Sequence, residues 1–462
     1  MKIYNTKSRT IENFVPHSEE LVTMYTCGPT VYHYAHIGNL RTYIMEDILE
    51  KSLKYLGYNV QRAMNITDVG HLSSDADTGE DKMVKSAKEQ KKGVLEIAKY
   101  YTDAFFRDCD ALNITKPEIV SNATDNIDEY IKLISILLEK EMAYESGGNI
   151  YFDTSKLANY YQLTNQNQDD LTFAVREDVE EDNNKINKTD FVLWFTKSKF
   201  DDQELKWNSP WGYGYPGWHI ECSGISLKYL GEYLDIHCGG VDNIFPHHTN
   251  EIAQSEACLG HSWCKYWVHG EHLNDASGKM SKSKGGILTV DVLQEEGYNP
   301  LSYRFMCLNS HYRKQLTFTY DSLSGAEVAY KKLKNKIASL MAGNEIDKDA
   351  IFKFDAQFKD VIADDLNTAN AITLVYDLLK SELNDDTKLV LIENWDKVLS
   401  LDLLKEEKVK HLEHEYIMNK IKERAEAKMN KEFLLADNIR EELSSLGVTL
   451  IDSRDGTTYK IN

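Results

Sequence analysis

His247 and Glu251 stand four positions apart in the stretch DIHCGGVDNIFPHHTNEIAQSEA, which covers positions 235–257 of the 462-residue sequence. The stretch predicts a strand, a glycine-containing turn and a helix that begins near Pro246. Side chains four residues apart leave one face of a helix. An imidazole and a carboxylate placed in this way can bind one metal ion, with Zn²⁺ the favoured candidate. A helix cap followed by solvent-exposed histidines is the alternative that this stretch leaves open.

The cysteines can provide the further ligands that such a site needs. The chain has seven of them, and its N-terminal segment MKIYNTKSRT contains no apolar signal core, so we expect the thiols to be reduced. One group, Cys258, His261 and Cys264 in CLGHSWC, has spacing typical of metal ligands, although no fourth ligand is obvious. The single cysteines that we expect to be small buried residues are Cys109, Cys238 and Cys307.

A second chemical pattern concerns phosphate. The loop KMSKS at positions 279–283, bounded by glycines, carries Lys279 and Lys282. Two lysines in a flexible loop suit a polyphosphate whose charge rises as it leaves, whereas a solvated lysine loop is the alternative for the string alone. His36-Ile37-Gly38-Asn39 stands at the start of a predicted helix, where backbone N–H groups and the helix dipole favour an anion.

The elements that must position these residues include a βαβ unit. Leu21 to Tyr25 alternates like a strand, positions 40–56 have helical apolar spacing, and Val60 to Thr67 predicts a second strand. This succession predicts a parallel sheet with a right-handed crossover, and ligands of such sheets bind beyond the carboxyl ends of the strands. Cys27 and His36 follow the first strand at that place.

The later part of the chain has a different pattern. Beyond Asn299 it turns helical, with amphipathic helices predicted at Tyr320 to Ala342 and at Asn367 to Glu382. A helical pair from Glu413 to Leu446 precedes the tail VTLIDSRDGTTYKIN, which predicts a β-ribbon. Between the predicted halves of the parallel sheet, a helix at Ile127 to Lys140, a short strand pair and polar segments indicate an insertion.

HIGN followed about 240 residues later by KMSKS resembles the two signatures of class I aminoacyl-tRNA synthetases. Further strings extend the resemblance to the cysteinyl-tRNA synthetase family over nearly the whole chain: TCGPTVYHYAHIGNLRT, NITDVGH, SPWGYGYPGWHIECS, DIHCGGVDNIFPHHTNEIAQS, GKMSKSKG, DDLNTANA and FLLADNIREEL. Two positions depart from the pattern. Asn39 stands where many class I enzymes have histidine, and Tyr459 stands where the family usually carries tryptophan.

The resemblance implies an α/β fold with a Rossmann-type parallel-sheet catalytic domain that is split by an insertion. An α-helical domain and a small C-terminal anticodon-binding domain would follow. The expected ranges are 1–116 and 212–299 for the two catalytic halves, 117–211 for the insertion, 300–400 for the helical stem and bundle, and 401–462 for the C-terminal domain.

The resemblance also implies the activity: ATP-dependent activation of L-cysteine, followed by transfer to the 3′ end of tRNA(Cys). It assigns the zinc ligands to Cys27, Cys222, His247 and Glu251, and the cysteine pocket to Thr67, Trp218 and His237. Zinc has a physical purpose here, because pocket shape rejects serine only weakly whereas a soft thiolate binds Zn²⁺ strongly. We therefore expect one zinc ion with a coordination position open to the substrate sulfur, and no editing domain.

For ATP, the resemblance and the residue types together assign His36 and Asn39 to the phosphates, Lys279 and Lys282 to the departing pyrophosphate, and Asp242 to the ribose. Mg²⁺ is expected to accompany ATP. Asp437 and Arg440 match the family's AD-x-x-R pattern and are expected to contact the anticodon.

The bulk composition limits the partners. No run approaches the roughly 18 apolar residues of a membrane span. Since the N-terminal segment also has no apolar signal core, we expect a cytoplasmic protein, which we take to be a monomer. The net charge of −21 argues mildly against a nucleic-acid partner, but charge acts within a Debye length of about 8 Å, so a local basic stripe can still bind tRNA. Two rivals are considered. The region after about position 400 argues against an amino-sugar ligase that couples cysteine to a small amine, and intact HIGN and KMSKS strings argue against a zinc-binding regulatory protein without catalysis.

Overall fold

The computed structural model describes residues 1–69, 82–164, 183–197, 203–275, 287–343, 345–405, 414–430, 432–445, 448–453 and 456–461, and the backbone of 278–279. These residues form two compact units, Met1–Leu404 and Lys405–Asn462, and each unit has its own hydrophobic core.

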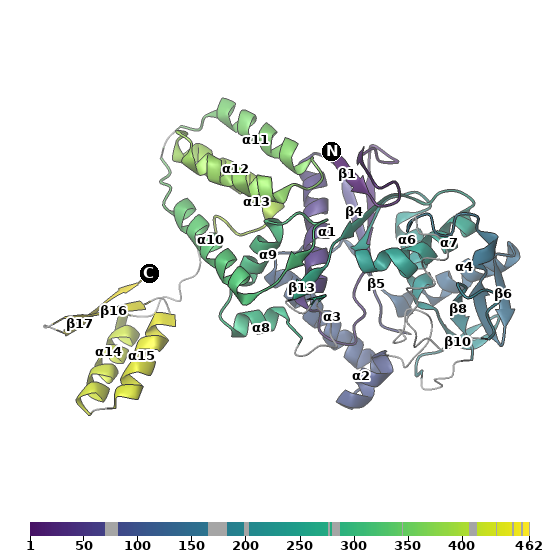
Figure 1. Cartoon of the computed structure of the whole chain (residues 1–462), viewed down its shortest axis with the longest axis horizontal. Coiled ribbons are helices and arrows are strands. Elements are labelled where there is room, and N and C mark those ends of the chain that lie inside the picture. Colours follow the sequence, from purple (N-terminus) through teal and green to yellow (C-terminus); the bar gives the residue numbers. More distant parts are fainter. Residues whose placement is uncertain are drawn as a thin grey trace. The chain divides into compact units, whose positions relative to one another are not determined.

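A parallel sheet of five strands lies at the centre of the first unit, in the order β12-β11-β3-β4-β5 (Figure 1). The strands are β3 (Val22–Thr26), β4 (Val60–Ile66), β5 (Ile119–Asn122), β11 (Leu234–Gly240) and β12 (Cys264–Gly270). Helix α1 (Ile37–Tyr55) connects β3 to β4, as the βαβ pattern predicts. The predicted α/β fold with a Rossmann-type parallel sheet is therefore confirmed.

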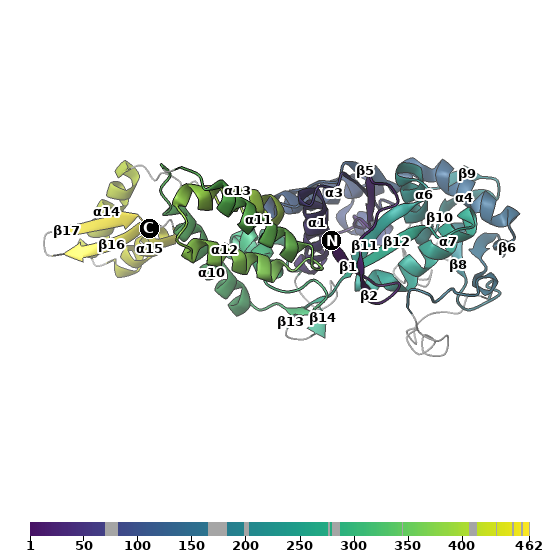
Figure 2. The ribbon, with the colours of Figure 1, turned by 90° about the horizontal axis from the view of Figure 1, so that it is seen from above.

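Both faces of this sheet are buried. Met24 and Tyr25, which are neighbours on β3, belong to two different hydrophobic cores because successive side chains of a strand point to opposite faces. In Figures 1 and 2, α1 lies on one side of the strands, and α6 (Trp218–Leu230) and α7 (Thr249–Leu259) lie on the other. Helices on both faces explain why nearly every residue of β3, β4 and β11 is buried, polar residues included.

The strand order fixes where a ligand can bind. From β3 the chain builds the sheet in one direction through β4 and β5, and from β11 it builds in the other direction to β12. The order therefore reverses between β3 and β11, and open α/β sheets bind ligands beyond the carboxyl ends of the strands at this point.

An antiparallel sheet of five strands, in the order β6-β7-β8-β10-β9, stands between β5 and β11 in the chain. Its strands are β6 (Ala143–Ser146), β7 (Asn149–Phe152), β8 (Phe191–Phe195), β9 (Trp207–Ser209) and β10 (Gly212–Pro216). Helix α4 (Ile127–Glu139) precedes it, at the place where the sequence predicts a helix. The sheet is larger than the predicted strand pair because FVLWF and GYGYP add strands to it.

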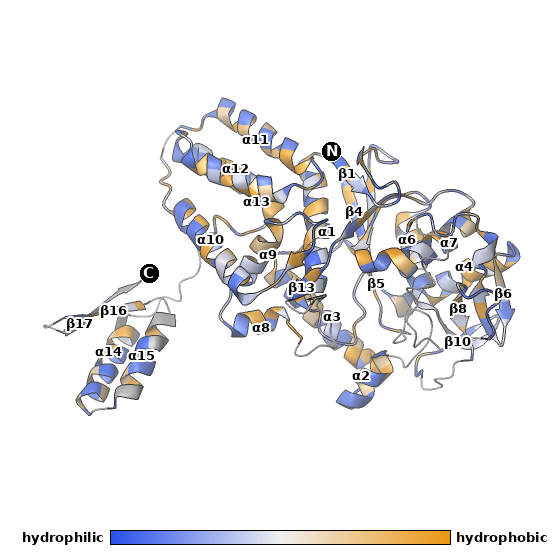
Figure 3. Ribbon diagram, in the orientation of Figure 1, coloured by the Kyte–Doolittle hydropathy of each residue, from blue (hydrophilic) through white to orange (hydrophobic). Residues whose placement is uncertain are grey.

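The rest of the first unit is mainly helical. Its helices are α2 (Lys82–Gln90), α3 (Val94–Ala111), α8 (Val290–Glu295), α9 (Pro300–Leu308), α10 (Tyr320–Ala338), α11 (Lys348–Ile362), α12 (Thr368–Lys380) and α13 (Asp385–Leu399). Figure 3 shows hydrophilic and hydrophobic residues on each of α11, α12 and α13, as amphipathic helices require. Asn367 caps α12 by accepting a hydrogen bond from the backbone N–H of Asn370, as expected of an asparagine at that position.

Short strands join distant parts of the first unit. The pair β1 (Lys2–Asn5) and β2 (Thr10–Asn13) forms a hairpin at the N-terminus, and Thr6 in its turn donates its backbone N–H to the carbonyl of Trp267 on β12 at 2.8 Å. A small sheet contains β13 (Leu273–Asp275), β14 (Gly278–Lys279) and β15 (Leu316–Thr317).

The second unit contains α14 (His414–Met429), α15 (Phe433–Ser445) and a ribbon of β16 (Val448–Ser453) and β17 (Gly456–Ile461). The predicted helical pair and the predicted ribbon are both present. A small core of Ile417, Ile421, Ile439, Leu443, Val448 and Leu450 holds them together. Among the described residues, no helix combines the length and the apolar composition that a membrane span needs.

Candidate active site

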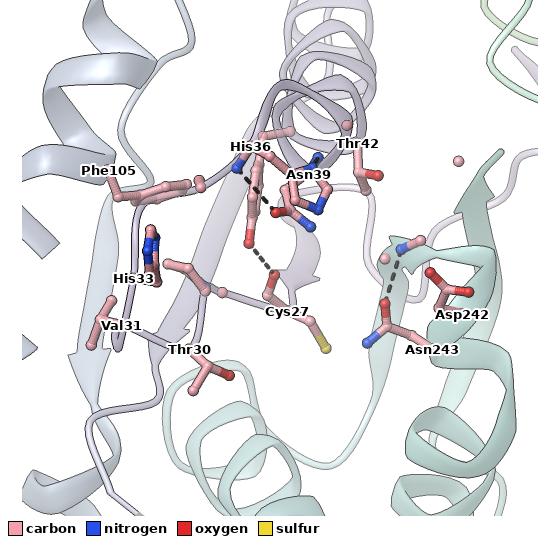
Figure 4. A pocket seen from close by; sticks show the side chains of 18 of the residues that line it. Cys27, Thr30, Val31, His33, His36, Asn39, Thr42, Phe105, Asp242 and Asn243 are labelled. Carbon is pink, nitrogen blue, oxygen red and sulfur yellow. Dashed lines mark hydrogen bonds between the residues drawn. The ribbon is translucent and has the colours of Figure 1, made fainter. Parts of the chain in front are cut away.

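A cavity of about 580 Å³ opens beyond the carboxyl ends of β3, β11 and β12. Loop residues that follow these strands line it, together with the N-terminus of α1. In Figure 4, Val31, His33 and Phe105 lie on one side of the cavity, Asp242 and Asn243 lie on the other, and the Cys27 sulfur points into the space between them. Of the residues that the sequence singles out, Cys27, His36, Asn39 and Asp242 line this cavity.

Four potential metal ligands meet at the base of the site. The ligand atoms of Cys27, Cys222, His247 and Glu251 all lie within 4.8 Å of one another. Cys27 Sγ lies 3.9 Å from Cys222 Sγ and 3.8 Å from Glu251 Oε1. His247 Nε2 lies 3.4 Å from Cys222 Sγ and 3.1 Å from Glu251 Oε1. A tetrahedral zinc with its usual bond lengths separates two sulfur ligands by about 3.8 Å and a nitrogen from an oxygen by about 3.3 Å. The donor set therefore fits zinc in both chemistry and spacing.

Separate elements bring these ligands together. Cys27 directly follows β3, and its backbone N–H donates to the carbonyl of Cys238 on β11 at 3.3 Å. Cys222 lies inside α6. His247 lies in a wide helical turn over Ile244–His248, and α7 begins only at Thr249. The four-residue spacing still brings His247 to Glu251, because the wide turn and the helix are continuous.

Burial makes negative charge on these ligands unfavourable unless a cation is bound among them. Burial raises the pKa of Cys27 well above its usual range, and the neighbouring Cys222 and Glu251 add to the rise. Burial also raises the pKa of the Cys222 thiol. Burial lowers the pKa of His247 to about 3, so its imidazole is neutral and can act as a ligand. Cys222 and Glu251 are buried and Cys27 is only partly exposed, so two thiols and a carboxylate in this place lose their protons together only when a bound cation compensates the charge.

A second set of four overlaps the first. The ligand atoms of Cys27, His237, His248 and Glu251 also lie within 4.8 Å of one another. The CLGHSWC string gives no third set among the described residues. Cys264 is buried, and the ring of His261 stacks on Tyr233 with centroids 4.5 Å apart. The cysteines predicted to be buried small residues, Cys109, Cys238 and Cys307, are buried.

Of the three predicted cysteine-pocket residues, Trp218 and His237 contact the four-ligand cluster, and none of the three lines the cavity. The ring centroid of Trp218 lies 4.3 Å from that of His247. His237 is fully buried, and its Nε2 lies 2.8 Å from Glu251 Oε2, so it orients this carboxylate. The Thr67 hydroxyl donates to Glu221 Oε2 at 2.9 Å and accepts from the side-chain amide of Asn65 at 3.0 Å.

His36 and Asn39 form a reciprocal hydrogen-bonded cap at the N-terminus of α1. The backbone N–H of Asn39 donates to His36 Nδ1 at 3.1 Å, and the backbone N–H of His36 donates to Asn39 Oδ1 at 3.3 Å. This reciprocal cap holds both side chains at the positive end of the helix, beside the cavity. Gly28 is needed near them, because a Cβ at this position would lie 1.6 Å from the carbonyl oxygen of Asn65.

The other predicted nucleotide ligands are spread around the cavity. Asp242 Oδ1 lies 3.4 Å from Nε2 of His272, on the side away from His33. Lys279 ends β14, where its backbone pairs with Asn274. Lys282 lies outside the described residues, as does most of the KMSKS string. In the second unit, Asp437 and Arg440 are exposed on α15.

Several buried histidines escaped prediction from the sequence. His219 Nδ1 lies 2.9 Å from His247 Nδ1, and His248 Nδ1 lies 2.8 Å from His269 Nε2. The only sign of them in the sequence was the histidine pair His247-His248 in the string PHH. Its second member looks solvent-exposed in the pattern, but it is fully buried in the structure.

Comparisons with known proteins identify relatives of the chain. Residues 13–328 match the family described as tRNA synthetases class I (C) catalytic domain. The cysteine–tRNA ligase of Treponema denticola is 46% identical over 100% of this chain and 99% of its own length. That of Borreliella burgdorferi is 44% identical over the same shares.

Solved structures support the fold. The methionyl-tRNA synthetase of Mycobacterium tuberculosis, solved with methionyl-adenylate, superposes with a TM-score of 0.54 at 14% identity. The superposition covers 83% of this chain and 90% of that protein. The match to the catalytic-domain family covers both halves of the parallel sheet, and both ligases are more than 40% identical to this chain over its full length. This chain therefore belongs to the cysteine–tRNA ligase family of class I aminoacyl-tRNA synthetases.

Proposed function

We propose that the chain activates L-cysteine with ATP and transfers it to tRNA(Cys), and that zinc held by Cys27, Cys222, His247 and Glu251 selects the substrate by its sulfur. The observation that carries the proposal is the four-ligand cluster, one member of which, Cys27, lines a cavity together with the N-terminus of α1. Cys27 is half-buried and lines the cavity, so a substrate there can approach the metal from the open side.

Zinc would supply a soft Lewis acid that binds the cysteine thiolate and has little affinity for the hydroxyl of serine. The chain's own residues hold it in place. His237 fixes the Glu251 carboxylate from behind, and Trp218 packs on the imidazole of His247. These contacts restrict the ligands to one geometry, which a metal site needs in order to discriminate between similar substrates.

Activation needs no nucleophile from the enzyme. A carboxylate oxygen of cysteine attacks the α-phosphorus of ATP. The bond between that phosphorus and the oxygen that bridges it to the β-phosphorus breaks, and pyrophosphate leaves. We assign His36 and Asn39, at the positive end of α1, to orient the phosphates near the reacting atoms. Lys279 and Lys282 would neutralise the pyrophosphate, Asp242 would bind the ribose, and Mg²⁺ would accompany ATP.

In the second step, a terminal hydroxyl of tRNA attacks the adenylate carbonyl and AMP leaves. We propose that the unit Lys405–Asn462 serves tRNA binding, with Asp437 and Arg440 on its exposed α15 surface. An amino-sugar ligase has a small acceptor and no use for such a unit. A regulatory metal protein has no use for a phosphate-binding helix terminus beside the metal.

Pyrophosphate exchange tests the proposal. Exchange should depend on cysteine, should be nearly absent with serine, and should fall when a chelator removes zinc and return when zinc is added. Equal exchange with serine, or full exchange in metal-free protein, would contradict the role of zinc. Charging of bulk tRNA then separates this activity from that of an amino-sugar ligase, which would leave tRNA uncharged.

A further inference from the structure

A chain of hydrogen bonds runs from the N-terminal hairpin to the metal cluster. Thr6 Oγ1 lies 2.7 Å from His269 Nδ1, and His269 Nε2 lies 2.8 Å from His248 Nδ1. His248 Nε2 in turn lies 3.3 Å from Cys27 Sγ. We call Thr6, His269 and His248 the relay. Its members come from the turn after β1, from β12, and from the wide turn before α7.

His248 presents a choice between two roles. Its Nε2 belongs to the second possible ligand set, so the imidazole is placed either to bind the metal or to donate a hydrogen bond to Cys27. The two roles need opposite tautomers, because a nitrogen that carries a proton cannot coordinate a metal. The hydrogen-bond partner of His248 Nδ1 influences which ring nitrogen carries the proton, and therefore which ligand set the metal occupies.

The ligand set Cys27, Cys222, His247 and Glu251 requires the donor role, and the relay can provide it. When Cys27 binds a metal it is a thiolate, and its sulfur can only accept a hydrogen bond from the Nε2 atom 3.3 Å away. The two rings lie inside the protein, since His248 and His269 are 0% and 5% exposed. His248 Nδ1 then accepts from His269 Nε2–H, and His269 Nδ1 accepts from the Thr6 hydroxyl. All three bonds are satisfied with every donor pointing toward the metal.

The anchoring of Thr6 gives the relay a fixed origin. The backbone N–H of Thr6 donates to the carbonyl of Trp267 at 2.8 Å, and the backbone N–H of Trp267 donates to the side-chain oxygen of Asn5 at 3.1 Å. The hairpin is thereby held against β12, two residues before His269. We infer that Thr6 and His269 are positioning residues that keep His248 as a hydrogen-bond donor to the Cys27 thiolate, and so direct the metal to Cys27, Cys222, His247 and Glu251. This inference rests on the proposed metal site.

Adjacent histidines provide the first test. His247→Gln and His248→Gln each replace a buried imidazole by a side chain that can donate from a similar place but binds zinc poorly. If His248 is a donor, His248→Gln retains zinc close to the wild-type affinity and His248→Ala loses about ten- to hundredfold, as is usual for an outer partner of a metal site. His247→Gln should lose far more. Equal losses in the two glutamine variants would overturn the inference, because both histidines would then be ligands.

Cobalt substitution provides the second test, at the far end of the relay. Removing a hydrogen bond from a metal-bound thiolate raises the energy of its lone pair, so the thiolate-to-Co²⁺ absorption band should shift to longer wavelength. We expect this shift in His248→Ala and, to a smaller extent, in Thr6→Val, whereas Thr6→Ser keeps the hydroxyl and the wild-type band. Thr6 lies outside the cluster, so Thr6→Val should fold normally. An unchanged band in Thr6→Val would overturn the relay, and wild-type protein that binds no Co²⁺ would instead overturn the metal site itself.

Discussion

His247 Nε2 and Glu251 Oε1 lie 3.1 Å apart across the junction between a wide helical turn and α7. The two side chains leave the same face of this continuous segment, so any metal that one of them binds is within reach of the other. They form the only part of the four-ligand cluster that comes from neighbouring positions in the sequence, since both cysteines reach the cluster from other elements.

Cys222→Ser should lower zinc content and cysteine activation together. Serine places a poor zinc ligand in α6, and the loss of zinc affinity should exceed the roughly ten- to hundredfold effect that removal of an outer partner causes. Zinc content by metal analysis and cysteine-dependent pyrophosphate exchange measure the two effects. Cys258→Ser is the matched control, since Cys258 is half-buried and outside both ligand sets. A normal zinc content in Cys222→Ser would contradict the assigned set.

Lys279→Ala and Lys282→Ala should slow activation without weakening cysteine binding. Each lysine is assigned to charge that develops on the leaving pyrophosphate, and loss of one such group typically costs about a hundred- to thousandfold in kcat. Pyrophosphate exchange gives kcat, and the cysteine-induced change in the Co²⁺ spectrum gives cysteine binding separately. Lys99→Ala, an exposed change on α3, should leave both values as they are. A large loss of cysteine binding in either lysine variant would place it elsewhere in the site.

Arg440→Ala should weaken tRNA charging and leave pyrophosphate exchange unchanged. The residue is exposed on α15, in a compact unit separate from the one that holds the cavity. Loss of one phosphate contact would reduce the salt dependence of tRNA binding by about one unit of slope, whereas loss of a base contact would alter preference for the anticodon. Lys422→Ala removes an equal charge from α14 and serves as the comparison. Equal effects of the two changes would indicate general charge attraction.

Arg304→Met should strongly destabilise the first unit. The guanidinium is fully buried and donates to Asp47 Oδ2 at 2.7 Å and to the carbonyls of Leu399 and Leu112 at 2.8 and 3.0 Å. Removing one partner of a buried ion pair typically costs about 3–5 kcal/mol. All seven tryptophans lie before position 404, so urea unfolding followed by tryptophan fluorescence reports on this unit. Lys99→Met breaks an exposed ion pair with Asp103 and should cost only about 0.3–0.5 kcal/mol.

Glu46→Gln should make stability less dependent on pH. Burial raises the pKa of Glu46 from 4.5 to about 8, although Arg62 opposes the rise. Among the described residues, neither carboxyl oxygen has a hydrogen-bond partner. The folded state therefore binds more protons than the unfolded state between these two values, and the free energy of unfolding falls as the pH rises through this window. Glutamine stays neutral, so its advantage over glutamate should grow up to about pH 8. Melting temperatures across this range measure it, and the exposed Glu89→Gln should show no such trend.

Much of the fold could be predicted because its signals are local. The apolar periodicity of α1 and the alternation of β3 and β4 lie within short windows, and the βαβ unit follows from them. The antiparallel sheet was underpredicted because β8 is a five-residue apolar run between polar segments, and short apolar runs do not reveal their partners. Helices α11 and α13 were not singled out by the sequence, since each was only one part of a broadly helical pattern.

The candidate site was predictable only in part, for a related reason. The His247–Glu251 spacing is visible in the sequence, but Cys222 required the family resemblance, because nothing near GWHIECS identifies its distant partners. The relay was invisible, since Thr6 and His269 are separated by 263 positions and neither residue type suggests the other. Contacts between ordinary residues that only the folded sheet brings together leave no pattern in a single sequence.

Because the antiparallel sheet stands between β5 and β11 in the chain, the ribosome makes Cys27 well before the other three ligands of the cluster. Cys27 leaves the ribosome long before Cys222, His247 and Glu251, with the whole of that sheet made in the interval. A growing chain thus has one thiol of the cluster and no companion for it until α6 and α7 emerge. At the proposed site, metal capture would therefore be a late event in biogenesis, and nascent chains that stall before α6 would carry the Cys27 thiol without the other three ligands.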